Sequence, residues 1–353
     1  MTQSSRACPL PPGFAFLAGV CWILVASSSQ AADRIKLDNT TNLNLGGSWT
    51  GGAAPGRGDM AVWNNTVTGA NTSLLGGNVF WQGIRIANPG GLVTIGPGGT
   101  LTLGAGQAGI SIDMSAATQD LTIQSSLLLK SGFGQFWNIA TGRTLTLETG
   151  AFTRGAGASL NIQGGGTVVT TNIQNHPTTS LIGTWATIGT GTTTNYATVN
   201  GSNQIVAYTG GTAAATAAAV TDTTGLVNYD VAAVGALGTA ANFNTLRYTG
   251  AAGTITGNFT TNGLLHSGTG ALTLSGNVTI GSDRELVLTN GDSNAVRDMT
   301  FSGVISDAVT GSSGLTKAGL GAVTLSGANT YTGVTSLSRG RVILTSTGTL
   351  GSA

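Results

Sequence analysis

From about residue 90 onward, the chain repeats one short pattern of apolar and polar positions. Three to five residues of alternating Val, Ile, Leu and Thr are separated by Gly, Asn, Ser or Asp, as in residues 90–106, 141–152, 164–173, 268–291 and 321–333. Leu or Val at every second position faces one side and the Thr between them faces the other, as a half-buried strand requires. The glycines and asparagines between patches supply the positive φ angles of tight turns. The pattern predicts many very short strands and no extended helix.

Two all-β architectures fit many short strands at near-regular spacing: an antiparallel sandwich, or a solenoid in which each coil stacks on the one before. A sandwich of more than about 300 residues would divide into domains with visible linkers, whereas this pattern continues without a Pro-rich or charged break. Stacked coils also account for the threonines, because like residues on successive coils form ladders. We therefore predict a solenoid; about 20 residues per coil would give a rod on the order of 70 Å long.

Two segments depart from the pattern. Residues 33–89 contain Trp49, Trp63 and Trp81, and we expect this region to fold over the open end of the first coil as an N-terminal cap. Residues 208–242 include an Ala-rich stretch that fits either a short helix or a loop extruded from the rod. The pattern leaves both alternatives open.

The N-terminus has the features of an export signal. Arg6 lies in a polar start, an apolar run extends from Phe14 to Val25, and the small residues Ser29 and Ala31 flank a cleavage site. We expect residues 1–32 to be a signal peptide, cleaved after residue 31 or 32. Both cysteines of the chain precede this site, so the mature protein would have no thiol for a disulfide or a thiolate metal site.

Composition narrows the class of function. Only 8% of the residues are charged and the formal net charge is +1, which gives no electrostatic reason to expect nucleic acid or an anionic membrane as a partner. Past residue 32, no apolar run approaches the roughly 20 residues of a spanning helix. The 40% of apolar residues recur in patches that can be buried, which argues against disorder.

One segment carries a recognisable motif. Residues 314–344 read GLTKAGLGAVTLSGANTYTGVTSLSRGRVIL and resemble the autotransporter-associated β-strand repeat, also called the passenger-associated transport repeat. The match is close over Gly314–Lys317, Thr324–Gly327 and Asn329–Gly333. The segment departs from the family at Leu337–Arg341, where the usual ending is smaller and less basic. Residues 58–69, 81–91 and 112–123 look like the body of large proteins that carry this repeat.

The resemblance implies a right-handed parallel β-helix that reaches the cell surface or the medium, often as an adhesin-like passenger without catalytic residues. Complete autotransporters end in a membrane β-barrel of amphipathic strands of about ten residues. The sequence here ends within repeat-like residues, so we expect the chain to be a fragment or to leave the cell by another route. Outer-membrane translocation would apply to the full-length protein.

Three motifs suggest chemistry and are weighed against a structural role. Residues 104–109, GAGQAG, have the spacing of a dinucleotide-binding loop, but a strand pattern follows where that loop needs a helix N-terminus. His176 and His266 are the only histidines, and neither has an adjacent acidic residue to orient a catalytic base. We expect a turn at 104–109 and structural or solvent-exposed histidines.

The densest charge cluster comprises Asp283–Glu285, Asp292 and Arg297–Asp298. Polysaccharide lyases and hydrolases built on β-helices gather such residues on one face, so an active site would lie here if the chain were an enzyme. The alternative is that these residues decorate turns and keep the rod soluble. Isolated acidic residues such as Asp113 and Asp120 do not form a calcium-binding series.

The sequence thus predicts an all-β, right-handed parallel β-helix: a signal peptide at 1–32, a cap at 33–89, and a passenger solenoid at 90–353 with its repeat at 314–344. We expect a non-enzymatic, secreted or cell-surface protein with no catalytic, cofactor-binding or metal-binding residues. Expected partners are host, matrix or cell-surface polysaccharides or proteins, and not nucleic acid. The alternative is a β-helical carbohydrate-active enzyme.

Overall fold

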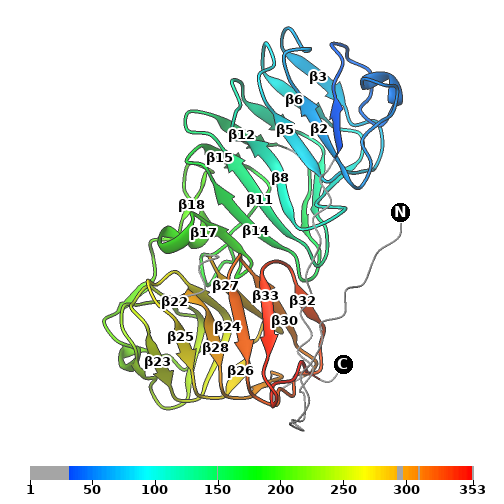
Figure 1. Cartoon of the computed structure of the whole chain (residues 1–353). Helices are drawn as coiled ribbons and strands as arrows, with labels where there is room; N and C mark the ends of the chain where they lie inside the picture. The colour runs from blue at the N-terminus through cyan, green and yellow to red at the C-terminus, as the bar shows by residue number, and fades with distance from the viewer. Residues whose placement is uncertain (1–31, 149, 292–296, 309–310, 352–353) are drawn as a thin grey trace, which may run out of the picture.

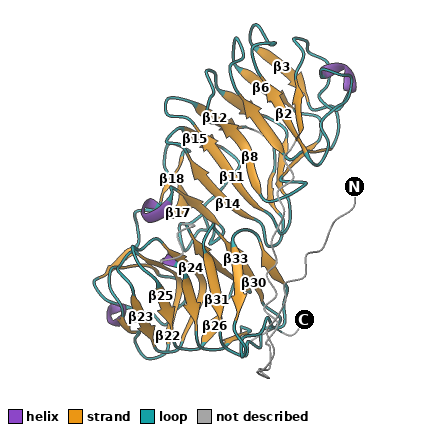
Figure 2. Ribbon diagram, viewed as in Figure 1, coloured by secondary structure: helices purple, strands orange, loops and turns teal. Residues whose placement is uncertain are grey.

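The computed structural model describes residues 32–351 except for 149, 292–296 and 309–310. Within these residues the chain consists of short strands and three single-turn 3₁₀ helices, η1 Gly46–Ser48, η2 Gly191–Thr193 and η3 Ala217–Ala219. Nearly every strand pairs in parallel with a strand of the next coil (Figure 2). The predicted parallel β-solenoid is therefore confirmed, whereas the predicted signal peptide lies outside the described residues except for Ala32.

The first part of the chain, residues 32–207, forms a three-sided stack of coils that we call the first stack. Its largest sheet has the order β1 (Ala32–Ile35), β2 (Asp59–Trp63), β5 (Gly83–Ile86), β8 (Gly109–Met114), β11 (Gly134–Ile139), β14 (Ser159–Gln163), β16 (Ala186–Ile188), β17 (Asn195–Val199) and β18 (Ile205–Ala207). The second sheet has the order β13 (Phe152–Arg154), β10 (Ser126–Leu129), β7 (Thr100–Leu103) and β4 (Val79–Phe80). The third has the order β15 (Thr167–Thr170), β12 (Thr144–Leu147), β9 (Leu121–Ile123), β6 (Val93–Gly96) and β3 (Asn71–Leu74).

Residues 212–344 form the second stack. One sheet has the order β19 (Thr212–Ala214), β20 (Asn228–Val231), β22 (Ala241–Tyr248), β24 (Phe259–His266), β27 (Glu285–Asn290), β30 (Gly314–Ala318) and β32 (Thr335–Leu337), with β26 (Val278–Ile280) beside β24 and β29 (Ile305–Ser306) beside β26. The other has the order β21 (Gly235–Ala236), β23 (Gly253–Thr256), β25 (Leu272–Leu274), β28 (Met299–Phe301), β31 (Ala322–Leu325) and β33 (Arg341–Leu344). Strand β24 turns a corner, because its first half pairs with β26 and its second half with β27.

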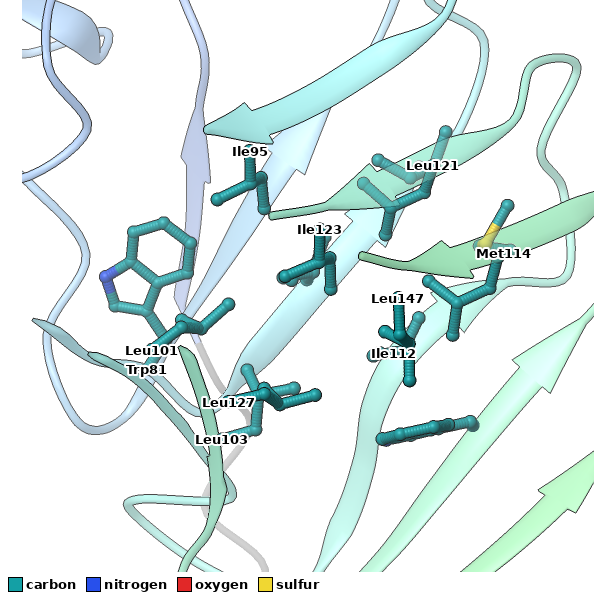
Figure 3. Close-up of a cluster of buried hydrophobic side chains, with 14 of the residues drawn as sticks. Trp81, Ile95, Leu101, Leu103, Ile112, Met114, Leu121, Ile123, Leu127 and Leu147 are labelled. Carbon is teal, nitrogen blue, oxygen red and sulfur yellow. The ribbon is translucent and has the colours of Figure 1, made fainter. Parts of the chain in front are cut away.

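The alternation of the sequence is repeated from coil to coil. In the first stack, Thr94, Thr122 and Thr146 lie side by side on β6, β9 and β12 and face outward. The aliphatic residues on either side of each threonine point inward and stack on one another, which removes their apolar surface from water. Figure 3 shows part of this column, with Ile95, Ile123 and Leu147 from the same three strands. The two-residue period of the strands therefore builds both the ladder and the core.

Tryptophans fill the N-terminal end of the first stack. Trp49, Trp63 and Trp81 are fully buried, and the Trp49 ring meets the other two edge-on at centroid distances of 5.5 and 5.7 Å. The indole N–H of Trp49 donates to the carbonyl of Leu43 at 2.9 Å. Parallel pairing already begins at β1, and the segment between β1 and β2 supplies Trp49 and Leu43. The division between a cap and a solenoid at residue 89 stays a prediction.

The structure does not form the single continuous rod expected from the sequence. Strands β16, β17 and β18 pair in antiparallel fashion and close the first stack, since an antiparallel hairpin cannot continue a parallel coil. The chain then turns at Tyr208–Gly211 and starts the second stack, which lies against the lower end of the first (Figure 1). The two stacks have separate hydrophobic cores.

The Ala-rich stretch that the sequence leaves open is neither a regular helix nor an extruded loop. It contributes β19 and η3 to the first coil of the second stack. Ala214, Ala217 and Val220 are buried there and belong to the core of that stack. Small side chains suit this position because the coil closes tightly over the end of the core.

Candidate functional site between the two stacks

Close backbone approach allows the two stacks to pack. A Cβ atom on Gly263 of β24 would lie 2.9 Å from the Cβ of Thr184 and 3.1 Å from the hydroxyl of Tyr196, both on the first stack. A small apolar cluster of Leu181, Tyr196 and Leu265 is buried beside this contact. The glycine brings β24 near enough for that cluster to exclude water.

A cleft with a volume of about 330 Å³ opens beside this contact and has walls from both stacks. The first stack contributes Arg154 and residues between His176 and Trp185. The second contributes the turn at Gly225–Leu226, two asparagines, and Ser282, Asp283 and Glu285. Its lining includes both apolar and polar side chains. The cleft exists only because the two stacks are folded against each other.

A charge-assisted pair joins the stacks at one wall. Arg154 on β13 donates to the two oxygens of Glu285 on β27 at 2.6 and 2.7 Å, and the Thr316 hydroxyl also donates to this carboxylate. Burial alone would raise the pKa of Glu285, but these hydrogen bonds and the arginine charge outweigh it and hold the pKa below its ordinary value. Glu285 is therefore ionised and held in one orientation.

A ladder of asparagines forms the floor of the cleft. Asn244 donates to the amide oxygen of Asn228 at 2.7 Å, and Asn262 donates to that of Asn244 at 3.0 Å. The ladder ends where the backbone N–H of Asp283 donates to Asn262, also at 3.0 Å. Asn228 in turn donates to the carbonyl of Thr179 in the first stack at 2.7 Å. These bonds fix the position of Asp283.

Asp283 and His176 face each other across the cleft mouth. Both side chains are exposed at the surface. The walls of the cleft still remove enough water to raise the pKa of Asp283 above its ordinary value. The negative charge of Glu285 also raises this pKa, whereas the nearby His176 lowers it. The Nδ1 atom of His176 accepts long hydrogen bonds of 3.4 Å from the N–H groups of Thr178 and Thr179. In the neutral ring, the proton therefore lies on Nε2.

Trp185 and Leu226 supply the apolar surface. The indole of Trp185 stacks on Phe152 with ring centroids 6.1 Å apart, and the guanidinium carbon of Arg154 lies 5.4 Å from its ring centroid. Leu226 on the opposite stack is 46% exposed and lines the cleft. The cleft thus combines an aromatic ring, an exposed leucine and ordered polar groups.

The last two coils of the second stack explain the motif at residues 314–344. Lys317 is fully buried, and its ammonium donates to the carbonyls of Ala318, Gly319 and Arg339. Asn329 accepts from the N–H of Ile305 on the preceding coil and donates to the carbonyl of Thr349 on the following one, at 2.8 and 2.6 Å. Each of these polar side chains satisfies backbone groups at a corner of the coil.

The comparison with protein families agrees with this geometry. Residues 315–344 match the model of the passenger-associated-transport-repeat. The resemblance seen in the sequence is therefore confirmed for this segment, hereafter called the passenger repeat. No curated protein and no solved structure matches the chain. Within the described residues, no helix has both the length and the apolar character to cross a membrane.

The residues at which the passenger repeat departs from its family contact the first stack. The carbonyl of Ser338 accepts from the N–H of Gly134 at 2.8 Å, and its hydroxyl lies 2.7 Å from that of Ser159. The guanidinium carbon of Arg339 lies 3.7 Å from the ring centroid of Phe136, and burial lowers the pKa of Arg339 to about 10. The larger and more basic ending thus forms the interface between the stacks.

The structure brings together some of the residues that the sequence singled out and separates others. Asp283, Glu285 and His176 line one cleft, although 107 residues separate the histidine from Asp283 in the chain. Asp298 lies elsewhere, 3.7 Å from Arg341, and Asp292 is outside the described residues. His266 is buried beneath the Tyr248 ring, where its Nε2 atom lies 2.8 Å from the carbonyl of Gly270.

The other sequence motifs have structural positions. Residues 104–108 form the turn between β7 and β8, and Gly109 is the first residue of β8, so the motif leads into a strand and not into a helix. Asp113 pairs with Arg85 and Asp120 with Arg143. Among the described residues, no group of three or more His, Cys, Asp or Glu is placed to hold a metal ion.

Sequence reasoning missed Arg154, Trp185 and Asn262, which complete the cleft. None of them lies in a charge cluster or a recognisable motif. The departure of Trp185 from the Val, Leu and Thr pattern was the one available signal, because a large aromatic ring is a poor fit for a narrow coil.

We predict that the Arg154–Glu285 pair couples the two stacks. A double-mutant cycle with Arg154→Met and Glu285→Gln should give a coupling energy of about 1–3 kcal/mol, because the pair is bidentate and largely shielded from water. The four free energies of unfolding can be measured in urea. The pair Arg143–Asp120, which is 3.5 Å apart and more exposed, serves as the control and should give less than about 1 kcal/mol. Equal coupling in both pairs would contradict the prediction.

Proposed function

We propose that this chain is an exported, non-enzymatic β-solenoid of the autotransporter-passenger type, which acts in an adhesin-like manner at the cell surface or in the medium. The observation that carries the proposal is the passenger repeat, which forms the final coils of the second stack. The N-terminal residues, with their signal-like pattern, support the same route out of the cell. The polar Thr ladders on the outside of the coils suit an extended surface in water.

The carboxylates of the cleft support a binding role better than a catalytic one. A glycosidase needs one carboxyl group as the acid and a second that is free to act as a base or nucleophile. Both oxygens of Glu285 already accept hydrogen bonds from Arg154, and one also accepts from Thr316. We therefore propose that Glu285 holds the stacks together, and that host, matrix or cell-surface polysaccharides or proteins are the partners of the chain.

Surface exposure tests the proposal. An epitope inserted at the exposed turn Gly201–Ser202 should be detected by antibody on intact cells that express the chain. A variant lacking residues 1–32 should keep the epitope inside the cells and serves as the control. Detection of the epitope only after lysis in both strains would contradict export.

Incubation of the purified chain with polysaccharides tests the alternative of a β-helical lyase or hydrolase. We expect no release of reducing ends or unsaturated products from neutral or acidic polymers. Turnover at an enzymatic rate that is lost in Asp283→Asn would show that the chain is an enzyme and would overturn the non-enzymatic proposal.

A further inference from the structure

We propose that the cleft between the two stacks binds a neutral saccharide, with the Trp185 indole against the face of a sugar ring and with the Asp283 carboxylate accepting hydrogen bonds from its hydroxyl groups. This inference rests on the proposed function, because it names the class of ligand that a surface-exposed chain would bind. It goes further by placing the ligand at one site that is built from both stacks.

The size of the cleft suits a small part of an oligosaccharide. Its volume of about 330 Å³ is at the lower end of the range of about 300–1,000 Å³ that is usual for small-molecule sites. A deep pocket for a whole cofactor would be larger, whereas a shallow contact would enclose no such volume. The cleft therefore fits one or two sugar rings of a longer chain.

The side chains around the cleft match both surfaces of a pyranose. A sugar ring has an apolar face of C–H groups and an edge of hydroxyl groups that donate and accept hydrogen bonds. Trp185 and Leu226 offer apolar surface, and a tryptophan provides a large rigid face at little cost in conformational entropy. Asp283 and Ser282 are exposed at the edge, where a carboxylate accepts and a hydroxyl donates or accepts.

The charge balance favours a neutral ligand over an acidic one. Among the described residues that line the cleft, Arg154 is the only arginine or lysine, and Glu285 neutralises it through two short hydrogen bonds. Asp283 adds a negative charge at the cleft mouth, where His176 faces it. A uronate, sulfate or phosphate group would be repelled by this carboxylate and by that of Glu285, and the arginine that lines the cleft is already neutralised.

The polar groups are held in place before any ligand arrives. The asparagine ladder holds the backbone of Asp283, and the Arg154–Glu285 pair fixes the wall behind Trp185. Trp185 is also supported from one side by Phe152. Such order reduces the entropy lost on binding, which is a large part of the cost of recognising a flexible, well-hydrated sugar.

Calorimetric titration of the purified chain tests the inference with defined probes. Cellotetraose, maltotetraose, mannotetraose and tetra-N-acetylchitotetraose represent neutral saccharides, and tetragalacturonate represents acidic ones. We expect at least one neutral tetrasaccharide to bind. We expect Trp185→Ala and Asp283→Asn each to weaken binding by at least about tenfold, the equivalent of one lost contact of about 1.4 kcal/mol.

Two matched variants control for the loss of an aromatic ring or a charge elsewhere. Phe80→Ala removes a 40% exposed ring on the first stack, and Asp120→Asn removes a carboxylate that is paired with Arg143. Both should bind like the unaltered chain. Trp185→Phe keeps an aromatic face and should restore part of the affinity, which separates loss of stacking from loss of folding.

The binding experiment and the surface-exposure experiment test the ligand and the export of the chain separately. Binding of tetragalacturonate alone, no binding of any neutral probe, or binding that is unchanged in both Trp185→Ala and Asp283→Asn would overturn the inference. Antibody detection of the inserted epitope on intact cells tests export independently of binding. A chain that is displayed but binds no neutral saccharide overturns only the ligand class, whereas a chain that binds but is retained inside the cell overturns the proposed function.

Discussion

Replacing Tyr331 with alanine should lower the free energy of unfolding of the second stack by about 3–5 kcal/mol. Tyr331 is fully buried in the passenger repeat, and its hydroxyl lies 2.6 Å from that of Thr335. Its ring fills the end of the core beside Leu325 and Ile305, so truncation leaves a cavity that neighbouring coils are too rigid to close. Urea denaturation followed by circular dichroism measures the change.

Two variants separate the sources of this loss. Tyr331→Phe removes only the hydroxyl and should cost about 1 kcal/mol. Leu344→Ala truncates a side chain that is 39% exposed on β33 and should cost about 0.5 kcal/mol or less. If Tyr331→Ala were no more harmful than Leu344→Ala, the ring would not be part of the core. Tyr331 belongs to the core of the second stack and not to that of the first, so the loss should fall mainly on the second stack.

Lys317 should make the stability of the chain rise with pH above neutrality. Burial lowers the pKa of its ammonium to about 7, from 10.5 for a free lysine, although the carboxylate of Asp298 opposes the shift. Between these two values the unfolded chain binds more protons than the folded one, so the free energy of unfolding increases with pH. The increase is at most about 1.4 kcal/mol per pH unit, and it is absent below pH 7, where both states are protonated.

Comparison with Lys317→Met isolates this effect. Burial also lowers the pKa of Lys36, to about 8, so the unaltered chain contains a second contribution of the same sign. The difference between the two chains, measured in urea at pH 6.5, 7.5, 8.5 and 9.5, removes that contribution and should widen with pH in favour of the unaltered chain. A difference that is constant over this range would show that Lys317 keeps its ordinary pKa when folded.

The polar and aromatic residues of the passenger repeat make two kinds of contact. Lys317, Asn329 and Tyr331 each act within the stack, through backbone carbonyls, through adjacent coils and through the core. Ser338 and Arg339, by contrast, act across the interface between stacks. The repeat therefore builds a general coil, while its ending adapts to the particular surface it meets.

Several features could be predicted from the sequence because they depend on neighbours in the chain. The alternation at residues 90–106 predicts strands with one buried face. Residues Val93–Ile95 of β6 have that pattern, whereas in β7 Thr102 is buried as well as its two leucine neighbours. The regular return of the pattern predicts parallel stacking, since a coil that leaves its strand edges unpaired must be followed by another. The motif at 314–344 indicates the passenger repeat directly.

The candidate site was predicted only in part. Asp283 and Glu285 stood out as part of a charge cluster. Their spacing did not show that Glu285 pairs with Arg154 while Asp283 lies exposed at the cleft mouth. His176 was recognised as one of two histidines, with no acidic residue near it in the chain. His176 lies near Asp283 only because the second stack packs against the first, and no local pattern in the sequence predicts that packing.

The sequence by itself determined the all-β class, the parallel coils, the outward threonine ladders and the passenger repeat, because a two-residue period and a spaced motif are local properties. Only the tertiary structure decided that the coils form two stacks, that β17 and β18 end the first, and that a cleft opens between them. These outcomes rest on contacts such as Arg154 with Glu285 and Ser159 with Ser338, which join residues 131 and 179 positions apart. Such contacts form only after both stacks have folded and glycines such as Gly263 allow their surfaces to pack closely. They therefore depend on the shape and charge of two folded surfaces and not on a local pattern in the sequence.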